Sequence, residues 1–215
     1  MSYQARGTIA FPEFIGARCY MMPFIQGRPE TLPEVFSGYA DTVAKFVLDG
    51  QDGEVGLITI DESYVEAGKS QRGYGAGERT LHTEACRSET LFTWGPTWGP
   101  VRDDDPRPGF VELDPDVRII IANSISDTCM VWDREIRDTT PDGDLSLRAH
   151  EFPRNTGRMM AAGEVMEMGI FTPHECIPQR ESGQRQFFRI VGKGVYGRED
   201  YFTRNAILER MGIFH

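Results

Sequence analysis

Residues 117–136 read VRIIIANSISDTCMVWDREI, and this stretch decides the fold class. Two runs rich in β-branched and apolar residues, 117–123 and 128–136, are separated by a short polar segment that contains Ser126 and Asp127. Short apolar runs bounded by turn residues are typical of β-strands. We therefore expect both runs to be strands, and their closeness in sequence predicts that they pair as a hairpin.

Further strand-like runs extend in both directions from this stretch. Turn signals separate them about every ten residues, a spacing typical of a barrel or jelly roll. No change in composition divides the chain, so we expect a single domain over 1–215. Within it we expect N-terminal strands and a helix over 1–53, a β-helix (jelly-roll) core over 54–191 and a C-terminal extension over 192–215. The expected strands are 7–10, 18–25, 54–60, 81–93, 164–171, 186–191 and 195–202.

One long helix is expected near the N-terminus. Thr31 is a suitable N-cap, and Pro33 falls in the first turn. Apolar residues then recur between residues 35 and 47 at the spacing of one buried stripe, and Gly50 ends the pattern. We expect this helix to pack on the sheet, which gives a mostly β fold class with at least one helix.

Composition narrows the classes of partner. The chain has 215 residues and a net charge of −10, without a basic stripe, so nucleic acid is not an expected partner. It has no apolar run of membrane-spanning length and no secretory signal pattern, which predicts a cytoplasmic protein that does not bind membranes. Its four cysteines form no CxxC pair and are expected to be mostly buried thiols. Nothing in the sequence indicates the oligomeric state.

The histidines give the main functional signal. His215 ends the chain and His150 lies in a polar stretch, so neither is expected to be a ligand. His82 and Glu84 share one face of an expected strand, because side chains at i and i+2 point the same way. His174 is the candidate for a third ligand. Two histidines and a carboxylate suit a non-haem Fe(II) oxygenase, and equally a zinc hydrolase, so the ligands alone do not identify the metal.

A pair of arginines follows His174. Arg185 and Arg189 share one face of an expected strand with Phe187, while Gln186 and Phe188 lie on the other. An arginine on the metal-facing side can hold a carboxylate through two parallel hydrogen bonds. We expect at least one of the two to bind an acidic ligand.

In order and spacing, these residues resemble the Fe(II)/2-oxoglutarate-dependent oxygenase superfamily, whose core is a double-stranded β-helix. The resemblance implies that His82, Glu84 and His174 bind Fe(II), and that the protein uses molecular oxygen to oxidise an unidentified small-molecule substrate. It implies that Arg185, or Arg189 if the register differs, binds the distal carboxylate of 2-oxoglutarate. Tyr74 would be a second contact to that cosubstrate. Catalysis would involve no further residue beyond the metal centre.

Two features depart from the family pattern. Glu84 stands where aspartate is commoner, which leaves the geometry of ligation open. Phe187 stands where a serine usually follows the arginine by two positions.

Tryptophans suggest where a substrate binds. Trp94 and Trp98 lie in a small tandem repeat beside Gly-Pro pairs, and we expect them to form a lid over the substrate. Trp132 alternates with apolar neighbours and is expected in the core.

Two alternatives keep the same architecture. A cupin-type metal-dependent enzyme would use His82, Glu84 and Glu89, although the Pro-x-Gly that normally precedes the distal histidine of that family is absent. A non-catalytic jelly-roll module for binding or structure would only pack the histidines.

Overall fold

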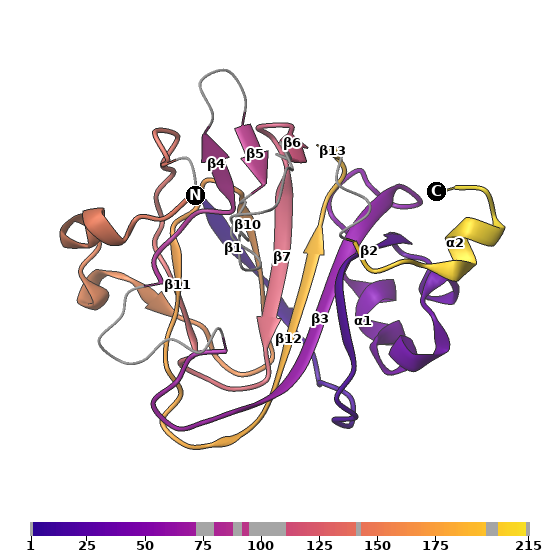
Figure 1. The fold of residues 1–215 in the computed structure, drawn as a ribbon, viewed down its shortest axis with the longest axis horizontal. Helices are drawn as coiled ribbons and strands as arrows, with labels where there is room; N and C mark the ends of the chain where they lie inside the picture. The colour runs from indigo at the N-terminus through magenta and orange to yellow at the C-terminus, as the bar shows by residue number, and fades with distance from the viewer. Residues whose placement is uncertain are drawn as a thin grey trace, which may run out of the picture.

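The computed structural model describes residues 2–71, 80–87, 92–94, 111–140, 143–196 and 202–213. These residues form antiparallel β-sheets with a few short helices (Figure 1). The helical segments are η1 (Pro29–Thr31), η2 (Glu34–Tyr39), α1 (Ala40–Lys45), η3 (Ser146–Glu151), η4 (Arg154–Thr156) and α2 (Ala206–Arg210). The strands are β1 (Tyr3–Thr8), β2 (Arg18–Ile25), β3 (Val55–Val65), β4 (Ala85–Arg87), β5 (Phe92–Trp94), β6 (Val111–Leu113), β7 (Arg118–Asn123), β8 (Cys129–Val131), β9 (Arg158–Met159), β10 (Glu164–Gly169), β11 (His174–Cys176), β12 (Gly183–Val191) and β13 (Val195–Tyr196).

The main sheet has the strand order β1-β10-β7-β12-β3-β2 in the described part of the chain. Figure 1 shows β7, β12 and β3 running side by side through the middle of the molecule. The β3–β12 pair has the longest register, from Gly183 opposite Val65 to Val191 opposite Leu57. This pair is the support on which the site described below is built.

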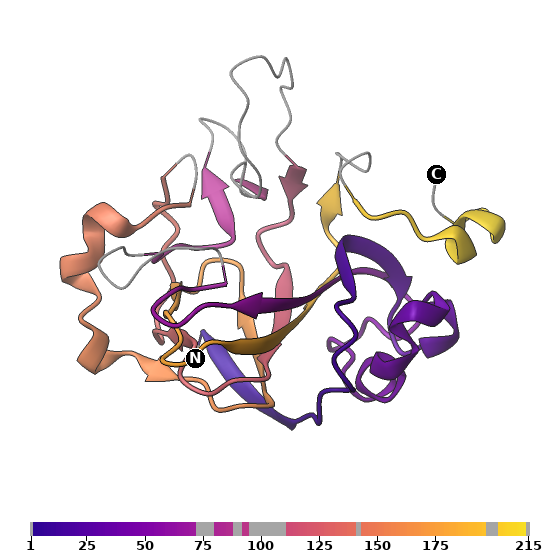
Figure 2. The ribbon, with the colours of Figure 1, turned by 60° about the horizontal axis from the view of Figure 1, so that its bottom comes forward.

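Two smaller sheets complete the described strands. One has the order β11-β8-β9, and a bridge between His82 and His174 adds a further segment beside β11. The other has the order β13-β6-β5-β4. Figures 1 and 2 both show the N-terminal helices on one side of the main sheet, while residues 143–160 lie on the opposite side.

The two faces of the β3–β12 pair have different surroundings. Ile58, Ile60 and Phe188 point to one face and are fully buried against the N-terminal helices. Thr59 and Arg189 point to the other face, toward a pocket. This alternation follows from the period of two along a strand, and it agrees with the face predicted for Arg189.

The predicted N-terminal helix is shorter and less regular than its apolar pattern suggested. Residues 34–39 are a 3-10 helix and only residues 40–45 are α-helical. Ser37-Gly38 is a poor helix-forming pair, and a Cβ at Gly38 would lie 2.8 Å from the Cβ of Pro12. Thr31 is not an N-cap, because its hydroxyl bonds to the backbone of Ile25 and Arg28 instead. The expected packing on the sheet is confirmed by the buried side chains of this segment: Phe36, Tyr39, Val43 and Phe46.

The predicted hairpin between residues 117–123 and 128–136 is wrong. Both runs contain a strand, but β7 pairs with β10 and β12, whereas β8 pairs with β11 and β9. The connection carries the chain from the main sheet into a smaller one, and Asp127 in it has a positive φ of 61°. Local sequence identified the strands, but pairing was decided by partners far along the chain.

Of the other predicted structural features, some are confirmed and one is wrong in part. The strand predicted at 18–25 matches β2, and Trp132 is buried as expected. The strand predicted at 81–93 is interrupted, since residues 83 and 84 are not in a strand and β4 begins only at Ala85. Among the described residues, no helix combines the length and apolarity needed to cross a bilayer.

Candidate metal centre

Three side chains predicted as ligands converge in the structure. His82 forms the bridge beside β11, Glu84 lies in a bend just before β4, and His174 begins β11. His82 and His174 exchange two backbone N–H to O=C hydrogen bonds of 3.0 Å each, which hold their backbones together. One ligand atom from each of the three side chains lies within 4.8 Å of the others, and all three are buried. This group could hold a metal ion.

Backbone carbonyls orient both imidazole rings. His82 Nδ1 lies 2.6 Å from the carbonyl oxygen of Thr80, and His174 Nδ1 lies 3.0 Å from that of Thr172. A carbonyl oxygen only accepts hydrogen bonds, so Nδ1 is the protonated nitrogen in each neutral ring. The lone pair is then on Nε2, the arrangement that usually accompanies metal ligation by histidine. His174 Nε2 lies 3.6 Å from Glu84 Oε1.

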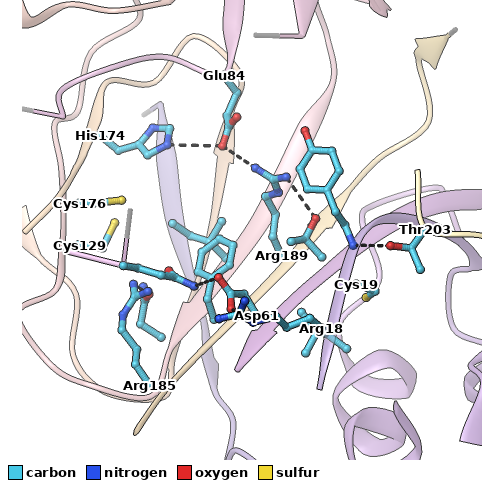
Figure 3. A pocket seen from close by; sticks show the side chains of 17 residues that line it. Arg18, Cys19, Asp61, Glu84, Cys129, His174, Cys176, Arg185, Arg189 and Thr203 are labelled. Atoms are coloured by element: carbon cyan, nitrogen blue, oxygen red, sulfur yellow. Dashed lines mark hydrogen bonds and ion pairs between the residues drawn. The ribbon is translucent and has the colours of Figure 1, made fainter. Parts of the chain in front are cut away.

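Glu84 lies between His174 and a buried arginine, as Figure 3 shows. Arg189 Nη1 donates to Glu84 Oε1 at 2.9 Å, and Nη2 donates to the hydroxyl of Thr59 at 3.2 Å. Burial alone would raise the pKa of Glu84. The positive charge of Arg189 is the largest effect in the other direction, and the pKa of Glu84 is held well below its ordinary value. Glu84 is therefore an ionised carboxylate.

The second oxygen of Glu84 is the exception in this network. Glu84 Oε2 is buried and accepts no hydrogen bond from any residue that the structure describes. A buried carboxylate oxygen normally has a partner, because leaving it without one costs free energy. A cation bound by the Glu84 carboxylate and the two nearby imidazoles would supply a partner for such an oxygen.

Strand β2 also contributes contacts to Arg189 and to its partner Thr59. The β2–β3 register shifts between Cys19 and Met22, and Met21 has a positive φ of 48°. In this position the Met21 amide donates to Thr59 Oγ1 at 3.1 Å, and its sulfur lies 3.6 Å from Arg189 Nη2. Bulges of this kind commonly redirect side chains near functional sites.

A pocket of about 420 Å³ adjoins the group. Its walls include Glu84, His174 and Arg189 at one end, and Arg185 projects into it from the same strand face (Figure 3). Arg185 is 2% exposed, donates to the amide oxygen of Asn123, and its guanidinium carbon lies 5.9 Å from the centre of the Phe187 ring. Farther along, the guanidinium of Arg18 is paired with Asp61 at 3.1 Å, and the surface of the pocket is otherwise largely apolar.

The remaining predicted site residues have different outcomes. Tyr74 and Trp98 lie outside the described residues, as does His215. The backbone of Trp94 lies in β5, but its side chain is outside the described part. His150 is exposed, in agreement with the expectation that it is not a ligand. The side chains of three of the four cysteines are described, and all three are thiols: Cys19, Cys129 and Cys176. The side chain of the fourth, Cys86, is outside the described part.

Sequence reasoning missed the polar partners of the two arginines. Asn123 follows a run of four apolar residues at the end of β7, and an amide at such a position was a usable signal of a polar contact. Thr59 could be found only with the β3–β12 register, which places it opposite Arg189. The Arg189–Glu84 pair joins residues that are 105 positions apart, and no local sequence pattern predicts it.

Comparisons of the chain with protein-family models, with curated proteins and with solved structures found no significant match.

Proposed function

We propose that this chain is a non-haem Fe(II)- and 2-oxoglutarate-dependent oxygenase that acts on a small molecule. His82, Glu84 and His174 are the proposed iron ligands. The observation that carries the proposal is the buried His–Glu–His group in the wall of a pocket that also contains Arg185.

The strand pairing supports a double-stranded β-helix. Taken in chain order, eight segments of the core are β3, the His82 segment, β7, β8, β9, β10, β11 and β12. The first pairs with the eighth, the second with the seventh, the third with the sixth and the fourth with the fifth. This is the pairing of one long hairpin wound into a helix. Strands β4, β5 and β6 then form an insertion between the second and third segments.

The donor set fits Fe(II). Two imidazole nitrogens and one carboxylate oxygen can occupy one side of the ion and leave positions for ligands from the pocket. The carboxylate of Glu84 supplies the third donor; its Oε1 bonds to Arg189, and its Oε2 has no hydrogen-bond partner among the described residues. Bound iron and 2-oxoglutarate would together supply the oxidising chemistry, using molecular oxygen.

Arg185 is the better candidate for the distal carboxylate of 2-oxoglutarate. Arg189 already neutralises the proposed ligand Glu84 and contacts Thr59. Arg185 lies four residues earlier on the same strand face, roughly 13 Å away along the backbone. Arg185 donates to the neutral amide of Asn123, lies near the ring of Phe187 and lines the pocket, where a guanidinium can bind a carboxylate through two parallel hydrogen bonds.

The surrounding residues position the ligand and exclude water. Ile121 and Phe187 give the pocket apolar walls. The Thr80 and Thr172 carbonyls fix the imidazole rings of His82 and His174, so the donors are in place before an ion arrives.

The test is an anaerobic titration of metal-free protein with Fe(II) and then 2-oxoglutarate, followed by visible absorption. We expect a weak charge-transfer band that needs both additions and is lost in His174→Ala. In Arg185→Met we expect the same band at saturation, with 2-oxoglutarate affinity reduced about 10- to 100-fold, the value of a charge-assisted hydrogen-bonded pair.

Other outcomes separate the alternatives. Iron binding without any band would favour a cupin-type metal enzyme. Failure to bind iron would remove the proposed centre and favour a non-catalytic jelly-roll module.

A further inference from the structure

We propose that Cys129 and Cys176 form a redox-active dithiol in the wall of the pocket, able to close into a disulfide. Both residues are thiols in the structure and both line the pocket. Cys129 lies on β8 and Cys176 on β11, so the two sulfurs come from neighbouring strands of one small sheet (Figure 3).

The register places the two cysteines directly opposite each other. Cys176 pairs with Cys129 in the antiparallel β11–β8 ladder. On one side of the pair, the Ile177 amide donates to the Thr128 carbonyl at 2.9 Å. Hydrogen-bonded and non-hydrogen-bonded pairs alternate along an antiparallel ladder. Cys176 and Cys129 are therefore a non-hydrogen-bonded pair, the kind in which facing side chains are closest.

This position has the geometry that a disulfide needs. The Cα atoms of a non-hydrogen-bonded pair lie about 4.5 Å apart, inside the range of roughly 4.4–6.8 Å found for disulfides. Both side chains point to the pocket face of the sheet, so closing the bond requires side-chain rotation rather than a change of register. Cys176 is half-buried and Cys129 is buried, which makes Cys176 the sulfur that an oxidant reaches first.

A low-molecular-weight disulfide such as oxidised glutathione is a sufficient oxidant. The sulfur of Cys176 attacks one glutathione sulfur, forms a mixed disulfide and releases one reduced glutathione. The sulfur of Cys129 then attacks the Cys176 sulfur and releases the second. Two cysteine thiols become one disulfide, and one oxidised glutathione becomes two reduced glutathiones, so atoms and electrons balance.

The test uses the full-length metal-free protein with a chelator present, so that iron chemistry does not contribute. After treatment with oxidised glutathione, we expect the intact mass to fall by two hydrogen atoms and peptide mapping to identify a Cys129–Cys176 link. Cys19→Ser should form the same link. In Cys129→Ser, the reaction should stop at a glutathione adduct on Cys176.

A second probe does not depend on oxidation. Phenylarsine oxide bridges two adjacent thiols, and we expect one equivalent to bind to the wild type and to Cys19→Ser but not to Cys176→Ser. A stable glutathione adduct on wild-type Cys176, a link that uses Cys86 instead, or failure to bind the arsenical would overturn the dithiol.

The dithiol has a consequence that rests on the proposed metal centre. Cys176 is two residues from His174 on the same strand face, so closing the bond restrains the strand that carries a proposed ligand. We expect Co(II) affinity to differ at least severalfold between the oxidised and reduced wild type, and to be unchanged by the oxidant in a Cys129→Ser/Cys176→Ser double variant. Equal affinities would contradict this coupling, whereas absence of Co(II) binding in reduced protein would contradict the metal centre itself.

Discussion

Two buried glutamates, Glu62 and Glu84, lie on opposite sides of the β3–β12 layer. They differ in the hydrogen bonds that their carboxylate oxygens accept. Glu62 lies on the face covered by the N-terminal helices and accepts four hydrogen bonds. Its Oε1 accepts from Tyr39 at 2.8 Å and from Gln186 at 3.1 Å, and its Oε2 accepts from the amides of Ile15 at 2.8 Å and Ala17 at 3.0 Å. Glu84 lies at the pocket and shares a salt bridge through one oxygen only.

The difference separates a structural carboxylate from a ligand-binding one. The four hydrogen bonds to Glu62 connect residues 15–17 and the N-terminal helices to the sheet. Both carboxylate oxygens of Glu62 therefore have protein partners. Glu84 has one oxygen without a hydrogen-bond partner among the described residues, and its carboxylate lies close to two imidazoles. Burial alone therefore does not mark a functional carboxylate, whereas incomplete hydrogen bonding next to oriented donors does.

The largest effect on stability is expected from Arg189→Met. This change leaves the buried Glu84 charge without its counter-ion, and we expect the free energy of unfolding of metal-free protein to fall by about 3–5 kcal/mol. Urea denaturation measures it. The double variant Glu84→Gln/Arg189→Met should recover part of the loss, because it buries no charge.

A matched control for that variant is Arg28→Met, which breaks an exposed pair with Asp52. It should change the free energy of unfolding by no more than about 0.5 kcal/mol. Equal effects of the two substitutions would contradict the role given to the Arg189–Glu84 pair.

On the other face, Glu62→Gln is expected to lower stability by about 1–3 kcal/mol. A glutamine amide group would turn a donor toward other donors, either the Ile15 and Ala17 amides or Tyr39 and Gln186. Metal affinity should stay at the wild-type value, since this side chain is not part of the pocket wall. Loss of metal binding in this variant would remove the distinction between the two faces.

Glu62 also predicts a pH dependence. Burial would raise its pKa, but the hydrogen bonds from Ile15, Tyr39, Ala17 and Gln186 lower it below the ordinary value of 4.5. The unfolded chain then takes up this proton first as the pH falls, so the stabilisation is complete above 4.5 and is lost as pH falls through the lower folded value. The stability difference between wild type and Glu62→Gln should therefore shrink in acid. A constant difference measured by urea denaturation across this window would refute the assignment.

A smaller effect than that of Glu62→Gln is expected from Tyr39→Phe. It removes one donor to Glu62 and leaves the other three in place, so we expect a loss of about 1 kcal/mol. Thermal unfolding should show a modest drop in Tm, with no change in metal affinity. A loss as large as that of Glu62→Gln would mean that Tyr39 contributes most of the network.

The sequence predicted the site better than the pairing of the strands. The convergence of His82, Glu84 and His174 was predicted from residue type and from the resemblance to a family pattern, although Glu84 lies in a bend and not in the expected strand. The hairpin prediction failed because β7 and β8 each prefer distant partners, which a local pattern cannot reveal. The Glu62 network and the Arg189–Glu84 pair were missed for the same reason, since each joins segments that meet only after the sheet has formed.

The most direct test of the central claim is a metal titration of three proteins, the wild type, Glu84→Gln and Glu62→Gln, with Co(II) as the spectroscopic probe. We predict one bound ion per chain in the wild type and in Glu62→Gln. In Glu84→Gln we predict affinity weakened by more than about a hundredfold, since losing an outer partner of a ligand alone costs about 10- to 100-fold. Equal affinity in Glu84→Gln and the wild type would contradict the assignment of Glu84 as the ligand.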